Sequence, residues 1–230
     1  MAAAHPASAV LSSLALKGVL ESSQSAFEQV VGRIDLRFDA TQAILERLAQ
    51  GARADLLILT SDALEDLRRK GEVTQVRALG SSGVGLAVRA GAAKPDIGSS
   101  EALVRALLSA DSVAHSKVGA SGIYFSELLE RLGISGRLKK RIVVEKGPVG
   151  LAVAAGEAEI GVQQLCELAP VRGIDIVGPL PPTLQRLTHF SAGVATRATN
   201  LESAKALMNL LTSEATRAAM LAGGLQPAAD

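Results

Sequence analysis

The stretch Leu57-Ile58-Leu59-Thr60-Ser61 decides the fold, because an apolar run ends there in two hydroxyl residues and a helical pattern begins at once. The run Leu56–Leu59 has the length of a strand, and Asp62–Lys70 has the periodicity of a helix that ends before Gly71. A strand followed directly by a helix is the repeating unit of an α/β protein. The first N–H groups of such a helix are unpaired, so Thr60 and Ser61 predict either a helix cap or an anion site.

Three further turns have the same design. Because Ser and Thr are also the ordinary caps of helices, capping accounts for any one of these turns taken alone. Four of them in one α/β chain favour a ligand cleft built from helix N-termini. The three turns read Leu11-Ser12-Ser13-Leu14, Phe38-Asp39-Ala40-Thr41 and Gly119-Ala120-Ser121-Gly122.

The pattern along the chain predicts two lobes, each a mixed, mostly parallel sheet flanked by helices. Strands and helices alternate up to Gly71, and we expect two more strands, Val73–Leu79 and Val84–Val88, joined by a turn at Gly80-Ser81-Ser82-Gly83. The alternation restarts near Ser99, and prolines after Gly178 predict a stiff return crossing. The expected boundaries are residues 1–82 plus 186–230 for lobe I and 83–185 for lobe II.

Composition narrows the classes of partner. The chain has 24 basic and 23 acidic residues, so no overall charge steers it to nucleic acid, and aromatic residues make up only 2%. The single Cys166 excludes an internal disulfide and a multi-cysteine metal site, and the three histidines lack metal-ligand spacing, so we expect no cofactor or metal. No apolar run approaches the ~20 residues that span a membrane.

Further stretches resemble the molybdate-binding-protein branch of the type 2 periplasmic solute-binding proteins. The resemblance covers nearly the whole chain and implies a two-lobed Venus-flytrap fold that closes at a hinge on a small anion, with an ABC transporter permease as a further partner. The stretches are Gly51-Ala52-Arg53-Ala54-Asp55-Leu56-Leu57-Ile58, Gly119-Ala120-Ser121-Gly122-Ile123-Tyr124 and Gly156-Glu157-Ala158-Glu159-Ile160-Gly161-Val162.

The same resemblance implies a set of ligand contacts. The family's oxyanion contacts in lobe I fall on Ser13, Thr41 and Thr60, and Ser12 lies beside them. In lobe II the family's Pro-Ala-Gly turn is replaced by Ala120-Ser121-Gly122, and its tyrosine after the Gly161 strand by Gln163 or Gln164. Because Gln can both donate and accept, this difference suits a carboxylate as well as a tetrahedral oxyanion. The expected ligand-binding set is Ser12, Ser13, Thr41, Thr60, Ser121, Gly122, Tyr124 and Gln163.

An enzymatic alternative stays open. The pattern Glu159-Ile160-Gly161-Val162-Gln163-Gln164-Leu165 with Glu167 is also similar to a subset of this superfamily that includes aconitate isomerase, which implies a proton shift in a small tricarboxylate. Such chemistry needs an acid or base beside the reacting carbon. The primary expectation is a binder without catalytic residues. If the chain is an enzyme, we expect His115, Tyr124 and Glu127 to act, and Cys166, Glu167 and His189 are further candidates.

Two expectations about the cellular compartment oppose each other. The opening residues Met1-Ala2-Ala3-Ala4-His5-Pro6 lack the basic and apolar regions of a secretory signal. The resemblance implies a periplasmic protein, whereas a chain that is complete as it stands would be cytoplasmic.

Overall fold

The computed structural model describes residues 7–229, which fold as two compact α/β units. Unit 1 contains the chain up to Ser81 and from His189 onwards, and unit 2 is Ser82–Thr188. Residues 1–6, in which the sequence predicts no secretory signal, lie outside the described residues.

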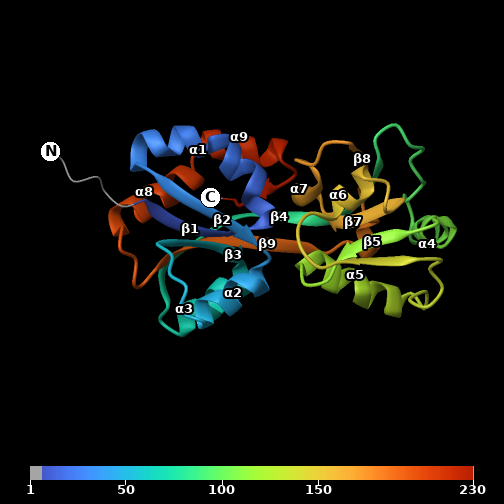
Figure 1. Cartoon of the computed structure of the whole chain (residues 1–230), viewed down its shortest axis with the longest axis horizontal. Helices are drawn as coiled ribbons and strands as arrows, with labels where there is room; N and C mark the ends of the chain where they lie inside the picture. The colour runs from blue at the N-terminus through green and yellow to red at the C-terminus, as the bar shows by residue number, and fades with distance from the viewer. Residues whose placement is uncertain (1–6, 230) are drawn as a thin grey trace. The chain divides into compact units, whose positions relative to one another are not determined.

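Unit 1 is a mixed sheet between two layers of helices. Its strand order is β2-β1-β3-β9-β4, and β10 pairs with β4. β1 is parallel to β2 and β3, whereas β9 is antiparallel to β3. Helices α1, α8 and α9 pack together on one face, and α2 and α3 cover the other (Figure 1). The elements are β1 (Ser8–Ser13), the 3-10 helix η1 (Leu14–Leu16), α1 (Lys17–Val31), β2 (Ile34–Asp39), α2 (Thr41–Ala49), β3 (Leu56–Thr60), α3 (Ser61–Arg69), the first part of β4 (Val73–Arg89), β9 (Leu187–Ala195), α8 (Leu201–Leu211), α9 (Glu214–Ala222) and β10 (Gln226–Pro227).

Unit 2 repeats this design on a smaller scale. Its strand order is β4-β7-β5-β6, and β8 pairs with β4. β5 is parallel to β6 and β7, whereas β7 and β8 are antiparallel to β4. The elements beyond β4 are α4 (Ser100–Ser109), β5 (Val113–Ser116), α5 (Ala120–Arg131), β6 (Arg141–Val144), α6 (Val149–Ala154), β7 (Ile160–Gln164), α7 (Leu165–Leu168), β8 (Ile174–Pro179) and the 3-10 helix η2 (Pro182–Leu184).

Each sheet buries both of its faces, as a sheet with parallel strands flanked by helices requires. In β5, Val113 joins the core that includes Leu103 of α4 and Phe125 of α5, whereas the next residue, Ala114, packs with Val149 of α6. This alternation is the two-residue period of a strand. In unit 1 the core beneath α2 and α3 consists of Leu11, Ile44, Ala54, Leu57, Leu59, Leu64, Leu67 and Val73.

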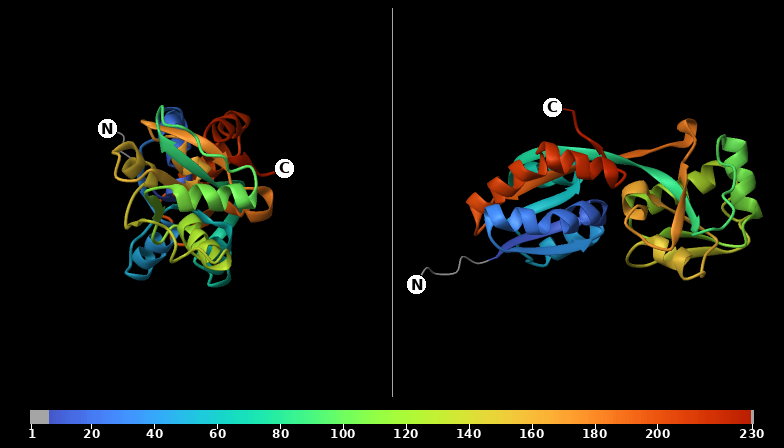
Figure 2. Two further views of the ribbon diagram at one scale, coloured as in Figure 1. Left: turned by 90° about the vertical axis from the view of Figure 1, so that its right-hand side faces the viewer. Right: turned by 90° about the horizontal axis from the view of Figure 1, so that it is seen from above.

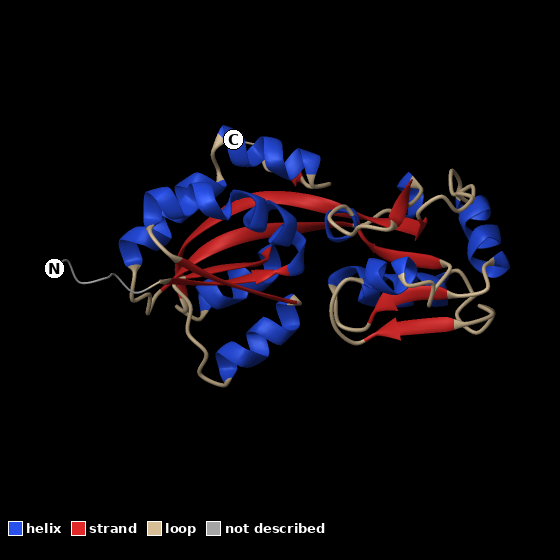
Figure 3. Ribbon diagram, turned by 45° about the horizontal axis from the view of Figure 1, so that its top comes forward, coloured by secondary structure: helices blue, strands red, loops and turns tan. Residues whose placement is uncertain are grey.

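The continuous strand β4 corrects the prediction of two strands joined by a turn. Neither Gly80 nor Gly83 has a positive φ. A Cβ on Gly80 would lie 2.4 Å from the backbone oxygen of Gln226, and one on Gly83 would lie 2.9 Å from Nε2 of Gln185. Glycine is therefore needed here because other chain segments approach closely, and not because the chain turns. The strand passes without a break from unit 1 into unit 2 (Figures 2 and 3).

A buried carboxylate, that of Asp55, links the chain at the end of the unit 1 sheet where β1 and β3 begin. Asp55 is 2% exposed, and its Oδ2 accepts a hydrogen bond from Ala9 N at 2.8 Å. Its Oδ1 accepts from Thr199 N at 2.6 Å, Thr199 Oγ1 at 3.1 Å and Asn200 N at 2.9 Å, which ties down the segment just before α8. Burial alone would raise the pKa of Asp55, but the hydrogen bonds from Asn200, Ala9 and Thr199 lower it below its ordinary value of 3.8.

Replacing Asp55 should therefore destabilise unit 1. We expect Asp55→Asn to lose about 3 kcal/mol of unfolding free energy, because an amide cannot accept at both of its ends and leaves buried N–H groups unpaired. Urea unfolding would measure the loss, with Asp66→Asn on the exposed face of α3 as the control. Because the folded pKa is lowered, the advantage of the wild type should be complete above about pH 4 and shrink as the pH falls below that value. Equal stabilities at pH 7 would contradict this role.

Candidate ligand-binding site

Three of the predicted residues meet where the parallel strands of unit 1 end, which we call carboxyl edge 1. β1 ends at Ser13 and β3 ends at Thr60, and the register places Ser12 opposite Ile58, so the two ends lie on neighbouring strands. Thr41 begins α2, and its Oγ1 accepts a hydrogen bond from Thr60 N at 3.3 Å. Carboxyl ends of parallel strands are where open α/β sheets bind ligands.

Ser13 provides the clearest sign of a missing partner at this edge. Its residue is 4% exposed, and within residues 7–229 its buried hydroxyl makes no hydrogen bond. The neighbouring Ser12 is fully buried and differs, because its hydroxyl donates to Ser13 O at 3.0 Å. A buried hydroxyl without a partner costs free energy that a ligand would recover, so Ser13 fits a contact residue better than Ser12 does.

The helices at this edge are not capped by their own side chains. Ser13 and Thr60 occupy N-cap positions but make no capping hydrogen bond, and α2 begins after Ala40, which has no side chain that could cap. By contrast, Ser99 caps α4 and Ser213 caps α9 through their hydroxyls. The ordinary capping interpretation therefore fails at carboxyl edge 1. The positive ends of the helix dipoles at this edge favour an anion.

A lysine adds positive charge at the same edge. Lys17 is the first residue of α1, and its Nζ lies 5.1 Å from the centroid of the Phe38 ring, near the end of β2. It pairs with Glu21 one helical turn further on, and both side chains are at least one-third exposed. An exposed pair of this kind contributes little to stability, so the Lys17 ammonium can exchange Glu21 for a ligand at small cost.

In unit 2 the equivalent carboxyl edge 2 is organised around Ser116. The Ser116 hydroxyl accepts from Gly119 N at 2.9 Å, and a Cβ on Gly122 would lie 1.9 Å from Ser116 O. The first turn of α5 is therefore pressed against the end of β5, and only glycine fits at position 122. Ser121 lies in this turn and is 2% exposed. Lys117, the residue after Ser116, forms an ion pair with Glu145 at 3.0 Å.

Gln163 and Gln164 end β7 at the same edge but differ in their bonding. Gln163 is fully engaged, because its Oε1 accepts from Val149 N at 2.7 Å and its Nε2 donates to the carboxylate of Glu167. Gln164 is 1% exposed, and its Nε2 has no partner in the described part of the chain. Of the two glutamines that the sequence left open, Gln164 has the free donor and Gln163 orients Glu167.

His115 is held on both ring nitrogens. Nδ1 lies 2.9 Å from Ser116 O, to which it donates, and Nε2 accepts from Arg141 Nε at 2.6 Å. Burial lowers the pKa of His115, the carbonyl of Ser116 raises it, and the charge of Arg141 lowers it further. The ring packs against Phe125, 5.6 Å away between centroids. A neutral histidine with both nitrogens occupied serves the core of unit 2 and has no nitrogen free for substrate.

Tyr124 and Glu127 of α5 also have partners of their own. The Tyr124 hydroxyl donates to Leu184 O at 2.6 Å and accepts from Arg131 at 3.1 Å. Arg186 stacks over the Tyr124 ring at 5.4 Å and approaches the exposed carboxylate of Glu127 at 3.5 Å. Both residues thus hold the segment around η2 against α5. The structure gathers Tyr124 and Glu127 around Arg186, whereas His115 belongs to the Arg141 network.

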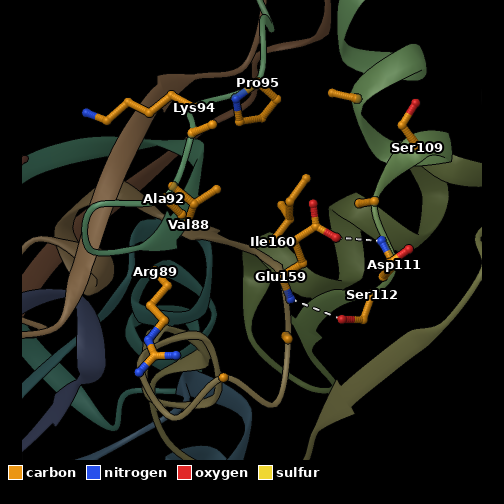
Figure 4. A pocket seen from close by; sticks show the side chains of 15 residues that line it. Val88, Arg89, Ala92, Lys94, Pro95, Ser109, Asp111, Ser112, Glu159 and Ile160 are labelled. Carbon is orange, nitrogen blue, oxygen red and sulfur yellow. Dashed lines mark hydrogen bonds between the residues drawn. The ribbon is translucent and has the colours of Figure 1, made fainter.

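A separate cavity of about 690 Å³ lies at the opposite edge of the unit 2 sheet, where β5 and β7 begin. Figure 4 shows Glu159 between Asp111 and Ser112 in its wall, with a carboxylate oxygen accepting from Asp111 N at 2.6 Å and Glu159 N donating to Ser112 Oγ at 3.0 Å. Arg89, at the end of β4, also lines this cavity, on the side of the sheet where β7 begins.

Within residues 7–229, no helix has both the length and the apolar character needed to cross a membrane. Over the same residues, His, Cys, Asp and Glu side chains form no group of three or more that could hold a metal ion.

Comparisons with known proteins identify the family to which this chain belongs. A family model described as bacterial extracellular solute-binding protein matches residues 9–226, and the chain belongs to this family. The periplasmic molybdate-binding protein of Azotobacter vinelandii superposes with a TM-score of 0.78 at 17% identity, covering 95% of this chain and 98% of that one. A sulfate-binding protein of Mycobacterium tuberculosis gives a TM-score of 0.72 at 15% identity, with 97% and 87% covered. The type 2 solute-binding fold expected from the sequence, in its molybdate-binding-like branch, is thereby confirmed.

A protein of known activity is more similar in sequence. An aconitate isomerase from a Pseudomonas species is 38% identical over 229 residues, which is 95% of this chain and 87% of that protein.

The contact between Gly122 and Ser116 makes a testable prediction. An alanine at position 122 would force the first turn of α5 away from β5, and we expect Gly122→Ala to lower the unfolding free energy by about 1–3 kcal/mol. Gly136→Ala is the matched control, since a Cβ there meets nothing within 4 Å. Urea unfolding of both variants measures the effect. Unchanged stability of Gly122→Ala would show that α5 does not depend on this contact.

Proposed function

We propose that this protein captures a small di- or tricarboxylate anion, of which aconitate is the type, with donors at carboxyl edges 1 and 2. The observation that carries the proposal is the buried hydroxyl of Ser13, which lacks a partner within residues 7–229 at the end of β1. The uncapped start of α3 and the partnerless Nε2 of Gln164 support it, because both offer hydrogen-bond donors at strand ends.

Charge favours a carboxylate over a tetrahedral oxyanion. Helix N-termini and neutral donors are sufficient to hold a compact oxyanion, but a tricarboxylate needs cationic partners as well. Each unit supplies one lysine at its carboxyl edge, Lys17 in unit 1 and Lys117 in unit 2. Both are in exposed ion pairs, from which a ligand carboxylate can displace the present partner.

In this proposal the two units close on one ligand, as the solute-binding family leads us to expect. Closure follows if the ligand gains contacts in the closed state, since it then shifts an existing equilibrium between open and closed forms. An ABC transporter permease is the partner that such a binding protein would serve.

Isomerisation of the captured tricarboxylate is the second candidate function. It is favoured by the 38% identity with an aconitate isomerase over nearly the whole chain. It is also favoured by Glu167, a half-buried carboxyl group whose pKa is raised to about 7 by burial, against a lowering by the hydrogen bond from Gln163. A carboxyl group that titrates near neutral pH can both accept and return a proton.

Ligand binding can be tested by thermal shift. A ligand at ~100 times its Kd adds about 2.7 kcal/mol of stability, so we expect trans- or cis-aconitate to raise the Tm and molybdate and sulfate to have little effect. Ser13→Ala should weaken carboxylate binding about tenfold, because one hydrogen bond to a charged group is lost.

The control for this variant is Ser22→Ala, whose hydroxyl bonds only to Val19 O within α1. A shift with molybdate and none with any carboxylate would overturn the proposed ligand. Equal affinities of wild type and Ser13→Ala would remove Ser13 from the site. Binding of aconitate without turnover would favour the binding-protein role over isomerisation.

A further inference from the structure

Glu167 is a carboxyl group held by a neighbouring side chain at carboxyl edge 2. It lies in the short helix α7, which follows β7 without a loop, so its carboxyl group stands at the end of a strand that is parallel to β5. Its Oε2 accepts a hydrogen bond from Gln163 Nε2. Gln163 is 1% exposed, and its other amide atom is fixed by Val149 N at 2.7 Å. A carboxylate held by a side chain that is itself fixed by a backbone N–H group has a defined orientation.

The elements packed against α7 leave this carboxyl group without a cationic partner. They are β7, α6, β8 and β4, whose uncharged Ser82 accepts from Cys166 N at 3.2 Å, and within residues 7–229 no ion pair reaches Glu167. β7 contributes the uncharged Gln163 and Gln164, and α6 has no ionisable side chain. β8 contributes Asp175, which accepts from Gly91 N at 2.9 Å. On α7 itself, the neighbouring Cys166 is 2% exposed, and the pKa of its thiol is raised by burial and by the charge of Glu167.

The remaining acid–base candidates are less suitable. The ring nitrogens of His115 and the hydroxyl of Tyr124 are occupied by protein partners. The carboxylate of Glu127 is exposed and paired with Arg186. The thiol of Cys166 is buried and protonated at neutral pH. Among the candidates of unit 2, Glu167 is therefore the group whose geometry suits proton transfer; His189 belongs to unit 1.

We propose that Glu167 is the catalytic base of an aconitate isomerisation and that Gln163 is the residue that positions it. This inference rests on the second candidate function above. The Glu167 carboxylate takes a proton from the methylene carbon of aconitate, and the electron pair left behind spreads over three carbons and the adjoining carboxylates. The resulting carboxylic acid returns the proton to the carbon at the other end of the allylic system. One C–H bond breaks, another forms and the double bond moves, with no oxidation or reduction.

The test compares Glu167→Gln with Glu157→Gln, an exposed glutamate in the loop before β7 that serves as the control. Interconversion of trans- and cis-aconitate in D2O is followed by NMR, and aconitate affinity is measured by calorimetry. We expect Glu167→Gln to lower kcat by at least 100-fold with affinity changed by less than fivefold, and Glu157→Gln to match the wild type. Deuterium uptake into aconitate should fall together with kcat.

The outcomes separate the two proposals. A wild-type protein that binds aconitate without turnover would overturn the isomerase function and this inference with it. Turnover by the wild type and by Glu167→Gln at similar rates would leave the function standing and overturn the role of Glu167. Circular dichroism and urea unfolding establish that the glutamine variant is folded before its rate is interpreted.

The positioning role of Gln163 has its own readout in the pH profile. Its hydrogen bond lowers the pKa of Glu167, which burial raises. A base must be ionised, so activity should rise with pH through about 7, and Gln163→Leu should move that rise to higher pH while lowering kcat. A lower kcat with the rise at an unchanged pH would contradict the positioning role.

Discussion

The carboxylate of Asp55 is the interaction on which the arrangement of unit 1 depends. It accepts hydrogen bonds from Ala9 at the start of β1 and from Thr199 and Asn200 before α8, and it directly precedes β3. Because β1 and β3 are thus joined where they begin, the parallel register carries through to their opposite ends. Ser13 and Thr60 therefore finish on neighbouring strands. Asp55 and carboxyl edge 1 therefore lie at opposite ends of β1 and β3.

The division between satisfied and unsatisfied groups separates framework from site. Asp55, His115, Tyr124 and Gln163 are polar residues whose partners lie within the protein, and they hold elements together. Ser13 and Gln164 are equally buried but have donors without partners in the described chain. Buried polar groups in native proteins are nearly always paired, so the unpaired atoms of Ser13 and Gln164, at the carboxyl ends of β1 and β7, support a ligand there. The third such atom in the described chain, Ser8 Oγ, lies at the amino end of β1, away from that edge. The same reasoning distinguishes Ser99 and Ser213, which cap helices, from Ser13, which does not.

Local pattern was sufficient to predict much of the fold and to choose candidate residues at the ends of its strands. The predicted strand Leu56–Leu59 and helix Asp62–Lys70 agree with β3 and α3 to within one residue at each end, because both have clear periodicity and ordinary end signals. The strand β8 and the four-residue helix α7 escaped prediction, since short segments beside Gly and Pro carry little periodicity.

Prediction from the sequence failed where contacts between residues far apart in the chain determine the local structure. Gly80 resembles a turn residue, yet the approach of Gln226 from the end of the chain explains it. Ser116 and Ser191 went unnoticed, although Ser116 receives Gly119 N and Ser191 bonds Ser61 at 2.7 Å. The different bonding of Gln163 and Gln164 could not be foreseen without knowing that α6 begins at Val149, beside the Gln163 amide. The cation at Lys17 was missed because its approach to Phe38 depends on how α1 packs on β2.

We propose that donors at the carboxyl edges bind a small carboxylate, and a crystal structure of the protein grown with trans-aconitate would test this. We expect carboxylate oxygens within hydrogen-bond distance of Ser13 Oγ and of Lys117 Nζ. Aconitate bound instead in the cavity beside Arg89 and Glu159, with Ser13 Oγ still without a partner, would contradict it.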